Sequence, residues 1–465
     1  MTRSLARTVL APAFVGALAL SLGACAKREA EPLASGPRAA HAAWARDVVI
    51  YEVNVRQYTP EGTFNALLPH LARLDDLGVD ILWFMPVQPI GVKQRKGLLG
   101  SYYAVSDYRK LNPEFGTQSE FKAVIDSAHA LGMRVLLDWV PNHTAFDHPW
   151  ITEHPDWYVH KADGTIDNAH DNEGRPTDWT DVAELDYVKP EMRAAMIADM
   201  RWWLTDMGID GFRQDVAGGA PMDFWHTARA ALDSTRADLF MLAEAESPEM
   251  HTAFDATYGW ELHHLLNAIA QGKAPVSKLD EYLAGQSRYP ANAYRMYFTS
   301  NHDENSWNGT EFERMADDNR PAFVLAATLA NSFPLLYTGQ EGRLSKRLRF
   351  FEKDTVTYDD TTTVPFYRAL FAAKEHTPAL WNGADGGVQT KLVGEGDADV
   401  YAFMRAKDQS TVIVAVNFGD KAQSFAYRDL PSRGEFHDAF TGANVTLAAS
   451  GVLKLPAHGF LVYIR

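Results

Sequence analysis

Acidic side chains stand at or near the ends of several hydrophobic segments of this 465-residue chain. Arg213 and Asp215 lie two residues apart in one segment, Glu244 lies in the next, and Asp303 follows a later one. Asp and Glu are rarely buried without a partner, so acids at such positions need an explanation. Arg213 would face the same side of a strand as Asp215 and lower the pKa of that carboxyl group. An ionised carboxylate opposite a protonated one cleaves glycosidic bonds, whereas a salt bridge at the rim of a sheet is the structural alternative.

The segments that must position these acids alternate between β-rich and helical patterns. The β-rich segments are 47–55, 81–87, 134–140, 211–217, 240–246, 254–260, 294–301 and 335–339. Strands that alternate with helices predict a closed (β/α)8 barrel, in which catalytic groups lie at the carboxyl ends of the strands. An open doubly wound sheet is the alternative, but no glycine-rich phosphate-binding turn follows the first strand.

The chain divides into a barrel with additions. We expect the barrel to span residues 44–383, with a small inserted domain at 141–189, because that stretch is irregular and too long for an ordinary loop. Residues 384–465 contain short β-rich runs separated by turns and predict an antiparallel β-sandwich domain.

The amino terminus has the pattern of an export signal. Arg3 and Arg7 precede an apolar run at 8–22, which is too short to span a membrane as a mature helix. The run ends in Leu-Gly-Ala-Cys, which resembles the bacterial lipoprotein signal, in which the cysteine is lipidated. We therefore expect 1–24 to be a signal peptide, Cys25 to be lipidated and 25–43 to be a tether. The protein would then lie in the cell envelope, periplasmic or on the outer surface; plain secretion is the alternative.

The net charge is −16, from 44 basic and 60 acidic residues, and no run of Lys or Arg occurs. Phosphate backbones and anionic membrane surfaces require a clustered basic footprint, so we expect neither as a partner, apart from the lipid anchor. Aromatic residues make up 12% of the chain, which fits either a large core or a cleft for a flat ligand. We expect a monomer that binds a neutral substrate.

Four segments together resemble the ordered motifs of the α-amylase family of retaining glycoside hydrolases. They are DWVPNHT (138–144), GFRQDVA (211–217), LAEAE (242–246) and FTSNHDENSW (298–307). The resemblance implies that Asp215 is the nucleophile, Glu244 the general acid/base and Asp303 the acid that stabilises the transition state. Glu246 is the rival of Glu244, and Glu304 is a similar decoy beside Asp303.

The same resemblance assigns supporting roles. Arg213 would orient the nucleophile, with Asp138 supporting the arginine. His143 and His302 would bond sugar hydroxyls, and Tyr103 would stack on the sugar, although Tyr102 could be confused with it.

Asn142 matches a calcium ligand of the family, which makes a structural calcium ion a candidate cofactor. Calcium takes oxygen ligands from separate segments. Four acids could contribute: Asp147, Asp163, Asp167 and Asp171. An asparagine that only hydrogen-bonds the loop is the alternative.

The implied activity is cleavage of α-1,4 bonds in starch-like α-glucans or maltooligosaccharides. Two departures leave the linkage open: Gly218-Gly219 stand where many α-amylases carry Lys-His, and Val216 resembles enzymes that act on α-1,6 bonds. The alternatives are an oligo-1,6-glucosidase, a neopullulanase-type enzyme or a transglycosylase. A non-catalytic sugar-binding protein is a further alternative, which the complete set of acids disfavours.

Overall fold

The computed structural model describes residues 41–396 and 398–465. The predicted signal peptide, the lipidation site Cys25 and nearly all of the tether therefore lie outside the described residues. Within the part of the chain that is described, none of the helices has the length and hydrophobicity needed to cross a membrane.

Parallel strands close into a barrel, which confirms the (β/α)8 prediction and excludes the open sheet. Going round the barrel from β1, the order is β1, β10, β9, β8, β7, β6, β3, β2. The strands are β1 (Ile50–Val53), β2 (Ile81–Phe84), β3 (Arg134–Trp139), β6 (Gly211–Gln214), β7 (Phe240–Ala243), β8 (Ala256–Tyr258), β9 (Tyr294–Tyr297) and β10 (Ser332–Tyr337). Closure comes from β1, which pairs with both β2 and β10.

The strands are shorter than the sequence predicts, and this places the acids at the rim. Asp215 directly follows β6, and Glu244 directly follows β7. The backbone of each acid still hydrogen-bonds to the neighbouring strand. The Asp215 N–H donates to the Trp139 carbonyl (2.8 Å), and the Glu244 N–H donates to the Gln214 carbonyl (3.0 Å). The backbone of both acids is thus fixed while their side chains project from the carboxyl end of the barrel.

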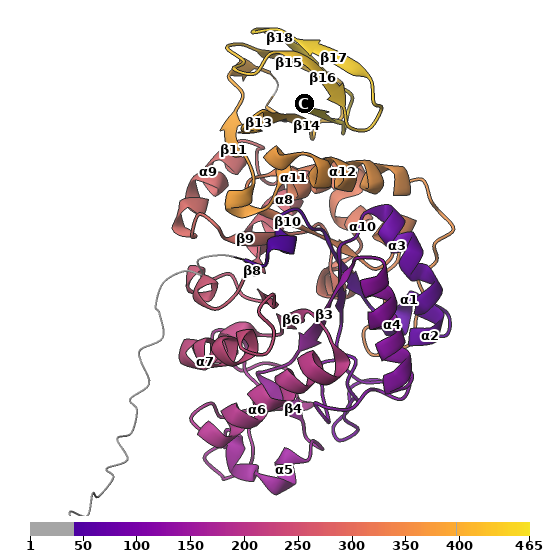
Figure 1. Ribbon diagram of the computed structural model, residues 1–465, viewed down its shortest axis with the longest axis vertical. Coiled ribbons are helices and arrows are strands. Elements are labelled where there is room, and N and C mark those ends of the chain that lie inside the picture. The colour runs from indigo at the N-terminus through magenta and orange to yellow at the C-terminus, as the bar shows by residue number, and fades with distance from the viewer. Residues whose placement is uncertain (1–40, 397) are drawn as a thin grey trace, which may run out of the picture. The chain divides into compact units, whose positions relative to one another are not determined.

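Helices surround the strands (Figure 1). They are α1 (Val55–Tyr58), α2 (Phe64–Leu67), α3 (Leu71–Leu77), α4 (Gln118–Ala130), α6 (Pro190–Trp202), α7 (Met222–Asp233), α8 (Trp260–Ala270), α9 (Lys278–Gly285), α10 (Glu311–Met315), α11 (Asn319–Thr328) and α12 (Val364–His376). The sequence signals that form these helices are clearest in α4. Thr117 and Glu120 form a capping box at its start, and the buried positions 121, 124, 125 and 128 recur at helical spacing. Its apolar face packs onto the barrel.

The predicted insertion, 141–189, connects β3 to α6. It contains β4 (His143–Ala145) and β5 (Val182–Glu184), which pair antiparallel, and the short helix α5 (Trp150–Glu153). Because it leaves the barrel at the carboxyl end of β3, its residues reach the rim where the acids lie.

The C-terminal part is antiparallel, as predicted. One sheet has the order β11, β13, β14, β19, β16, β17, and the other β12, β15, β18. The strands are β11 (Val388–Lys391), β12 (Gly394–Glu395), β13 (Val400–Lys407), β14 (Ser410–Asn417), β15 (Gln423–Tyr427), β16 (Gly434–Asp438), β17 (Asn444–Leu447), β18 (Gly451–Leu455) and β19 (Phe460–Ile464). A core that includes Ile413, Phe425 and Leu453 lies between the sheets.

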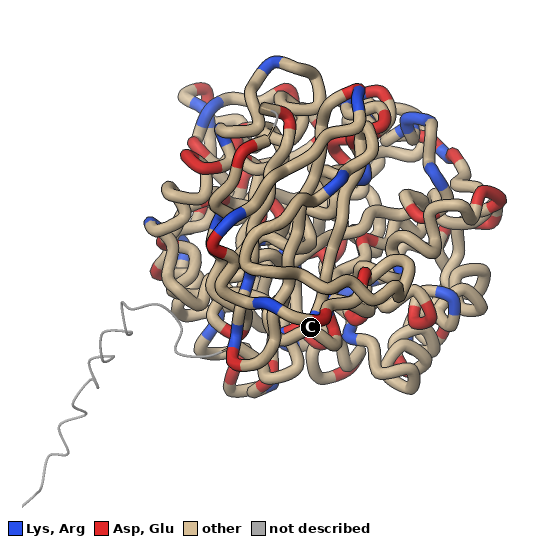
Figure 2. Tube along the Cα trace, turned by 90° about the horizontal axis from the view of Figure 1, so that it is seen from above, with Lys and Arg blue, Asp and Glu red and all other residues tan. Residues whose placement is uncertain are grey.

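A buried arginine joins this domain to the barrel. Arg405, on β13, is fully buried, and its guanidinium donates to backbone carbonyls at the end of α11 and in the connection from α12 to β11. The acceptors are the carbonyls of Thr328, Leu329, Leu380, Trp381 and Gly387. Along the described backbone, Lys and Arg positions are interspersed with Asp and Glu positions (Figure 2).

Candidate active site

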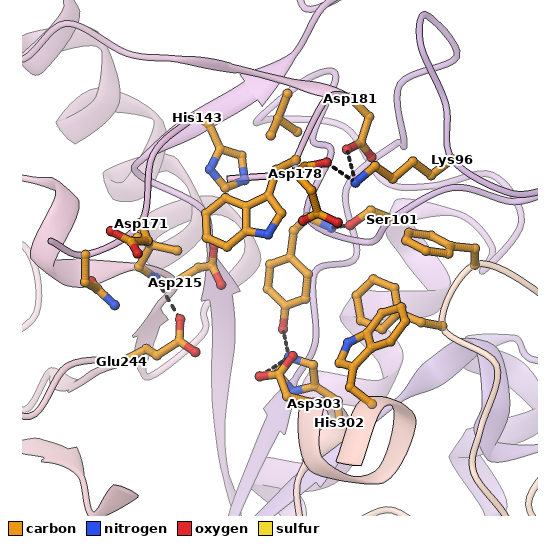
Figure 3. A pocket seen from close by; sticks show the side chains of 18 of the residues that line it. Lys96, Ser101, His143, Asp171, Asp178, Asp181, Asp215, Glu244, His302 and Asp303 are labelled. Carbon is orange, nitrogen blue, oxygen red and sulfur yellow. Dashed lines mark hydrogen bonds and ion pairs between the residues drawn. The ribbon is translucent and has the colours of Figure 1, made fainter. Parts of the chain in front are cut away.

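A cavity of about 890 Å³ opens at the carboxyl end of the barrel (Figure 3). Its walls come from the strand ends, the inserted domain and the loops around residues 96–103 and 350–351. Six of the residues predicted as catalytic or substrate-binding line it: Tyr103, His143, Asp215, Glu244, His302 and Asp303. The structure therefore brings together residues that are as much as 200 positions apart in the sequence (303 − 103).

Arg213, beneath the cavity, contacts three carboxyl groups. It lies on β6 and is fully buried. Its Nη1 donates to Asp138 Oδ1 (2.9 Å) and Asp215 Oδ1 (2.8 Å), and its Nη2 forms an ion pair with Glu244 Oε1 (2.9 Å). One positive charge therefore serves three acids, and ionising all of them would leave a buried excess of negative charge.

The excess of negative charge is reduced because carboxyl groups around Arg213 stay protonated to a higher pH than usual. Burial raises the pKa of Asp215 to about 6, although Arg213 opposes the shift. Burial likewise raises the pKa of Glu244 to about 7, with repulsion by Asp215 and Asp303 adding to it. Arg213 lowers the pKa of Asp215, as predicted from the sequence, but desolvation outweighs the guanidinium, so the net shift is upward and the predicted direction is wrong. The higher pKa makes Glu244 the group that retains a proton near neutral pH.

Glu244 is also fixed by the backbone that follows Asp215. The N–H of Val216 donates to Glu244 Oε2 (2.8 Å), and Val216 adopts a left-handed conformation with φ 43° and ψ 48°. That conformation is costly for a β-branched residue, so the surrounding contacts must hold it in place. The rival Glu246 turns elsewhere: its carboxylate pairs with Arg295 (2.5 Å) and accepts the N–H of Glu261 at the start of α8.

A second charged group lies across the cavity. His302 Nδ1 contacts Glu52 Oε1 (2.5 Å), and its Nε2 lies 2.8 Å from the Tyr103 hydroxyl and 3.3 Å from Asp303 Oδ2. Burial disfavours a charged imidazole, but Asp303 and Glu52 outweigh it and raise the pKa of His302 to about 9. His302 is therefore a cation at neutral pH.

Glu52 was missed by the sequence reasoning. It lies inside β1, where every residue is buried, and an acid within such a strand was the available signal. Its partner His302 is 250 residues away.

The remaining predicted contacts separate into those that face the cavity and those that do not. Burial lowers the pKa of His143 to about 4, which leaves a neutral imidazole in the wall. Tyr103 stacks on His302 with ring centroids 5.3 Å apart, whereas the Tyr102 hydroxyl donates to Asn54 outside the cavity lining. Glu304 pairs with His263 at 3.0 Å.

Asn142 would bind a calcium ion through Oδ1, whereas its contact with the loop uses the amide nitrogen. Its Nδ2 donates to the His170 carbonyl (3.0 Å). The four candidate acids are engaged elsewhere: Asp147 with the N–H groups of Val92 and Lys93, Asp163 with Thr165, Asp167 with Lys161, and Asp171 with Arg175. Within residues 41–396 and 398–465, no group of three His, Cys, Asp or Glu side chains is placed to hold a metal. The calcium site stays a prediction.

Comparison with known proteins agrees with this geometry. The profile of the alpha amylase catalytic domain matches residues 38–393, and that of the alpha amylase C-terminal all-beta domain matches residues 393–463. The crystal structure of an alpha-amylase from Lactobacillus plantarum is 29% identical, with a TM-score of 0.81, and the match covers 91% of this chain and 99% of that one.

The curated relatives include an alpha-amylase and a maltosyltransferase. Alpha-amylase MalA of Haloarcula japonica is 28% identical over 89% of this chain and 62% of its own length. An alpha-1,4-glucan:maltose-1-phosphate maltosyltransferase of Streptomyces coelicolor is 26% identical over 86% of this chain and 64% of its own length. This chain thus spans less than two thirds of either relative.

Proposed function

This chain belongs to the alpha-amylase family, and from that premise we propose that it is a retaining glycoside hydrolase acting on α-1,4 bonds of starch-like α-glucans or maltooligosaccharides. One observation carries the proposal: Asp215 and Glu244 contact the same buried guanidinium at the floor of one cavity, and Glu244 has the higher pKa. A nucleophile and a proton donor are the two carboxyl groups that retaining hydrolysis needs. The complete set of acids disfavours a non-catalytic sugar-binding protein.

Each residue then has a step. Asp215 attacks the anomeric carbon and forms a glycosyl ester, while Glu244 gives its proton to the departing oxygen. Glu244, now a carboxylate, removes a proton from the water that opens the ester. Asp303 and the cationic His302 hold the hydroxyls of the bound sugar, and neutral His143 donates or accepts at the opposite wall.

The charges in the cavity favour a neutral glucan over a sugar phosphate, the substrate class that the maltosyltransferase relative's name indicates. Seven acids line the cavity, namely Asp171, Glu173, Asp178, Asp181, Asp215, Glu244 and Asp303. Its lysine and arginine are both engaged: Lys96 with the Asp178 carbonyl (2.5 Å) and Arg175 with Asp171 (2.7 Å). A phosphate dianion would meet this negative field and would be repelled.

Action on α-1,6 bonds is the second candidate, and it rests on Val216, which directly follows Asp215 and lines the cavity. Initial rates on maltoheptaose, starch, pullulan and isomaltotriose decide between the linkages, and faster cleavage of isomaltotriose than of maltoheptaose would reject the α-1,4 assignment. NMR of the first product tests retention: we expect the α-anomer, and initial release of the β-anomer would reject the mechanism.

We also propose that Cys25 anchors the protein in the bacterial cell envelope. The support is the Leu-Gly-Ala-Cys sequence after a basic and apolar start. Replacing Cys25 with serine should release the protein to the soluble fraction or leave its precursor uncut. A soluble wild-type protein with an unmodified amino terminus would reject the anchor.

A further inference from the structure

Gly218 and Gly219 pack closely against the inserted domain, Gly218 against Asn172 and Gly219 against Asn142. They belong to the short turn Ala217–Gly219 after Asp215. A Cβ atom on Gly218 would lie 2.7 Å from Asn172 Oδ1, and one on Gly219 would lie 2.0 Å from Asn142 Oδ1. Neither glycine has a left-handed φ. The absence of a side chain on Gly218 therefore makes room for Asn172, and that on Gly219 for Asn142.

Asn172 belongs to the segment 170–175, which we call the wall segment. Asn172 Oδ1 accepts the N–H of Gly218 at 2.7 Å, and the His170 carbonyl accepts a bond from Asn142. Asp171 braces the segment internally, since it accepts the Arg175 N–H (2.9 Å) and pairs with the Arg175 guanidinium. The wall segment is thus a braced loop seated on the turn.

The wall segment also faces substrate. Its side chains at Asp171, Asn172, Glu173 and Arg175 line the same cavity as the catalytic acids. They supply carboxylate, amide and guanidinium groups, which pair with sugar hydroxyls. They offer no aromatic surface for stacking.

The position of Glu244 shows which end of the substrate the wall segment faces. Glu244 gives its proton to the leaving oxygen in the proposed mechanism, so the leaving group departs on its side. The backbone that holds Glu244 at Val216 continues two residues to Gly218, on which Asn172 sits. Figure 3 shows Asp171 on the side of Asp215 and Glu244, with His302 and Asp303 across the cavity.

We propose that the wall segment is the binding surface for the first leaving-group sugar. We further propose that Asn172 is the specificity-determining residue that positions this sugar. The ligand is an α-glucosyl unit that offers free hydroxyls. This inference rests on the proposed function. It predicts that the preference for a sugar acceptor over water depends on Asn172.

Partition of a common intermediate tests the inference. α-Maltosyl fluoride loads Asp215 with a maltosyl group and releases fluoride, and added glucose then competes with water for the ester. In either reaction the bond from C1 to Asp215 breaks, a bond from C1 to the incoming oxygen forms, and the incoming proton goes to Glu244. The ratio of maltotriose to maltose therefore isolates acceptor binding from acid/base function. For Asn172→Ala we expect this ratio to fall roughly tenfold, as the loss of one or two hydrogen bonds implies.

Asn444→Ala is the matched control, because Asn444 is exposed on β17 of the C-terminal domain. Its ratio should equal that of the wild type. An unchanged ratio in Asn172→Ala, including the case in which both products fall equally, would overturn the wall segment as a sugar site. No turnover of maltosyl fluoride by the wild type would reject the proposed function instead.

Hydrogen exchange tests the contact between Asn172 and Gly218 independently of catalysis. Asn172→Ala should accelerate exchange of the amide in peptides that span 216–219, because the Gly218 N–H loses its acceptor. Equal exchange in the variant and the wild type would overturn the seating of the wall segment on the turn.

Discussion

Replacing Asp215 with asparagine should lower the pKa of Glu244. Both carboxyl groups contact Arg213, Asp215 through Nη1 and Glu244 through Nη2. Asparagine keeps the shape of the side chain but removes its negative charge. Glu244 then loses a repelling neighbour while it keeps the guanidinium.

The size of the shift follows from the separation of the charges. Two carboxylates of a retaining pair lie roughly 5.5 Å apart, and at an effective dielectric constant of about 20 they repel by about 3 kcal/mol. That energy corresponds to about 2 pKa units. The pKa of Glu244 should therefore fall from about 7 to a value near 5. Formation of the glycosyl ester neutralises Asp215 in the same way, so the shift would convert Glu244 from acid to base between the two steps.

Carbon-13 NMR of protein labelled at the glutamate carboxyl carbons measures the shift. Glu244→Gln assigns the resonance in the wild type, and the double variant assigns it in Asp215→Asn. Asp215→Asn should also lose nearly all turnover while keeping its fold. A Glu244 pKa that stays at 7 or rises would refute the argument that the two acids repel each other through the cluster.

The other predictions concern pH, charge, chain length and calcium. The rate on maltooligosaccharides should be greatest between about pH 6 and 7, because Asp215 is protonated below that range and Glu244 is ionised above it; a rate that keeps rising to pH 9 would contradict both assignments. In Glu52→Gln, His302 loses its buried partner. Because the native pKa of His302, about 9, exceeds its unfolded value of about 6.5, the stabilisation is complete below pH 6.5 and is lost as pH rises through 9. The whole shift represents about 3 kcal/mol, of which the variant should lose only a part, because Asp303 also raises the pKa of His302 and is retained. Urea unfolding should therefore show a deficit in the variant at pH 6 that shrinks by pH 9, and an equal deficit at both would count against the charged pair. Trp307 is 52% exposed at the cavity rim, so Trp307→Ala should reduce kcat/KM severalfold on maltoheptaose but little on maltotriose, and equal losses on both would exclude a stacking site for a distant sugar. If a calcium ion is bound, a chelator should lower Tm and calcium should restore it; an unchanged Tm, with no metal by elemental analysis, would remove the ion.

The barrel and the acids at its rim could be predicted because their signals are local. Each apolar strand is visible as a short run, and the residue after it is necessarily at the rim in a parallel barrel. Position places Asp215 and Glu244 near the rim, but the choice of Glu244 over Glu246 comes from the family motif, because both glutamates lie in the predicted strand 240–246. The contact between Arg213 and Asp215 was also predicted, from their spacing on one strand, whereas the contact between Arg213 and Glu244 was not.

The contacts that tune the site could not be predicted, because they join segments that are distant in sequence. Glu52 acquires its role from His302, and Asn172 from Gly218. The net direction of the Asp215 pKa depends on the depth of burial, which spacing along a strand does not reveal.

The guanidinium of Arg405 has a consequence for protein engineering. Four of its five carbonyl acceptors, those of Thr328, Leu329, Leu380 and Trp381, precede the β-sandwich that supplies the arginine, so neither domain is an interchangeable module. A truncated barrel would leave the carbonyls at the end of α11 without their hydrogen-bond donor. An isolated sandwich would expose Arg405 without these acceptors. A chimaera that exchanges C-terminal domains between relatives should therefore be joined so that the arginine and its carbonyls come from the same parent.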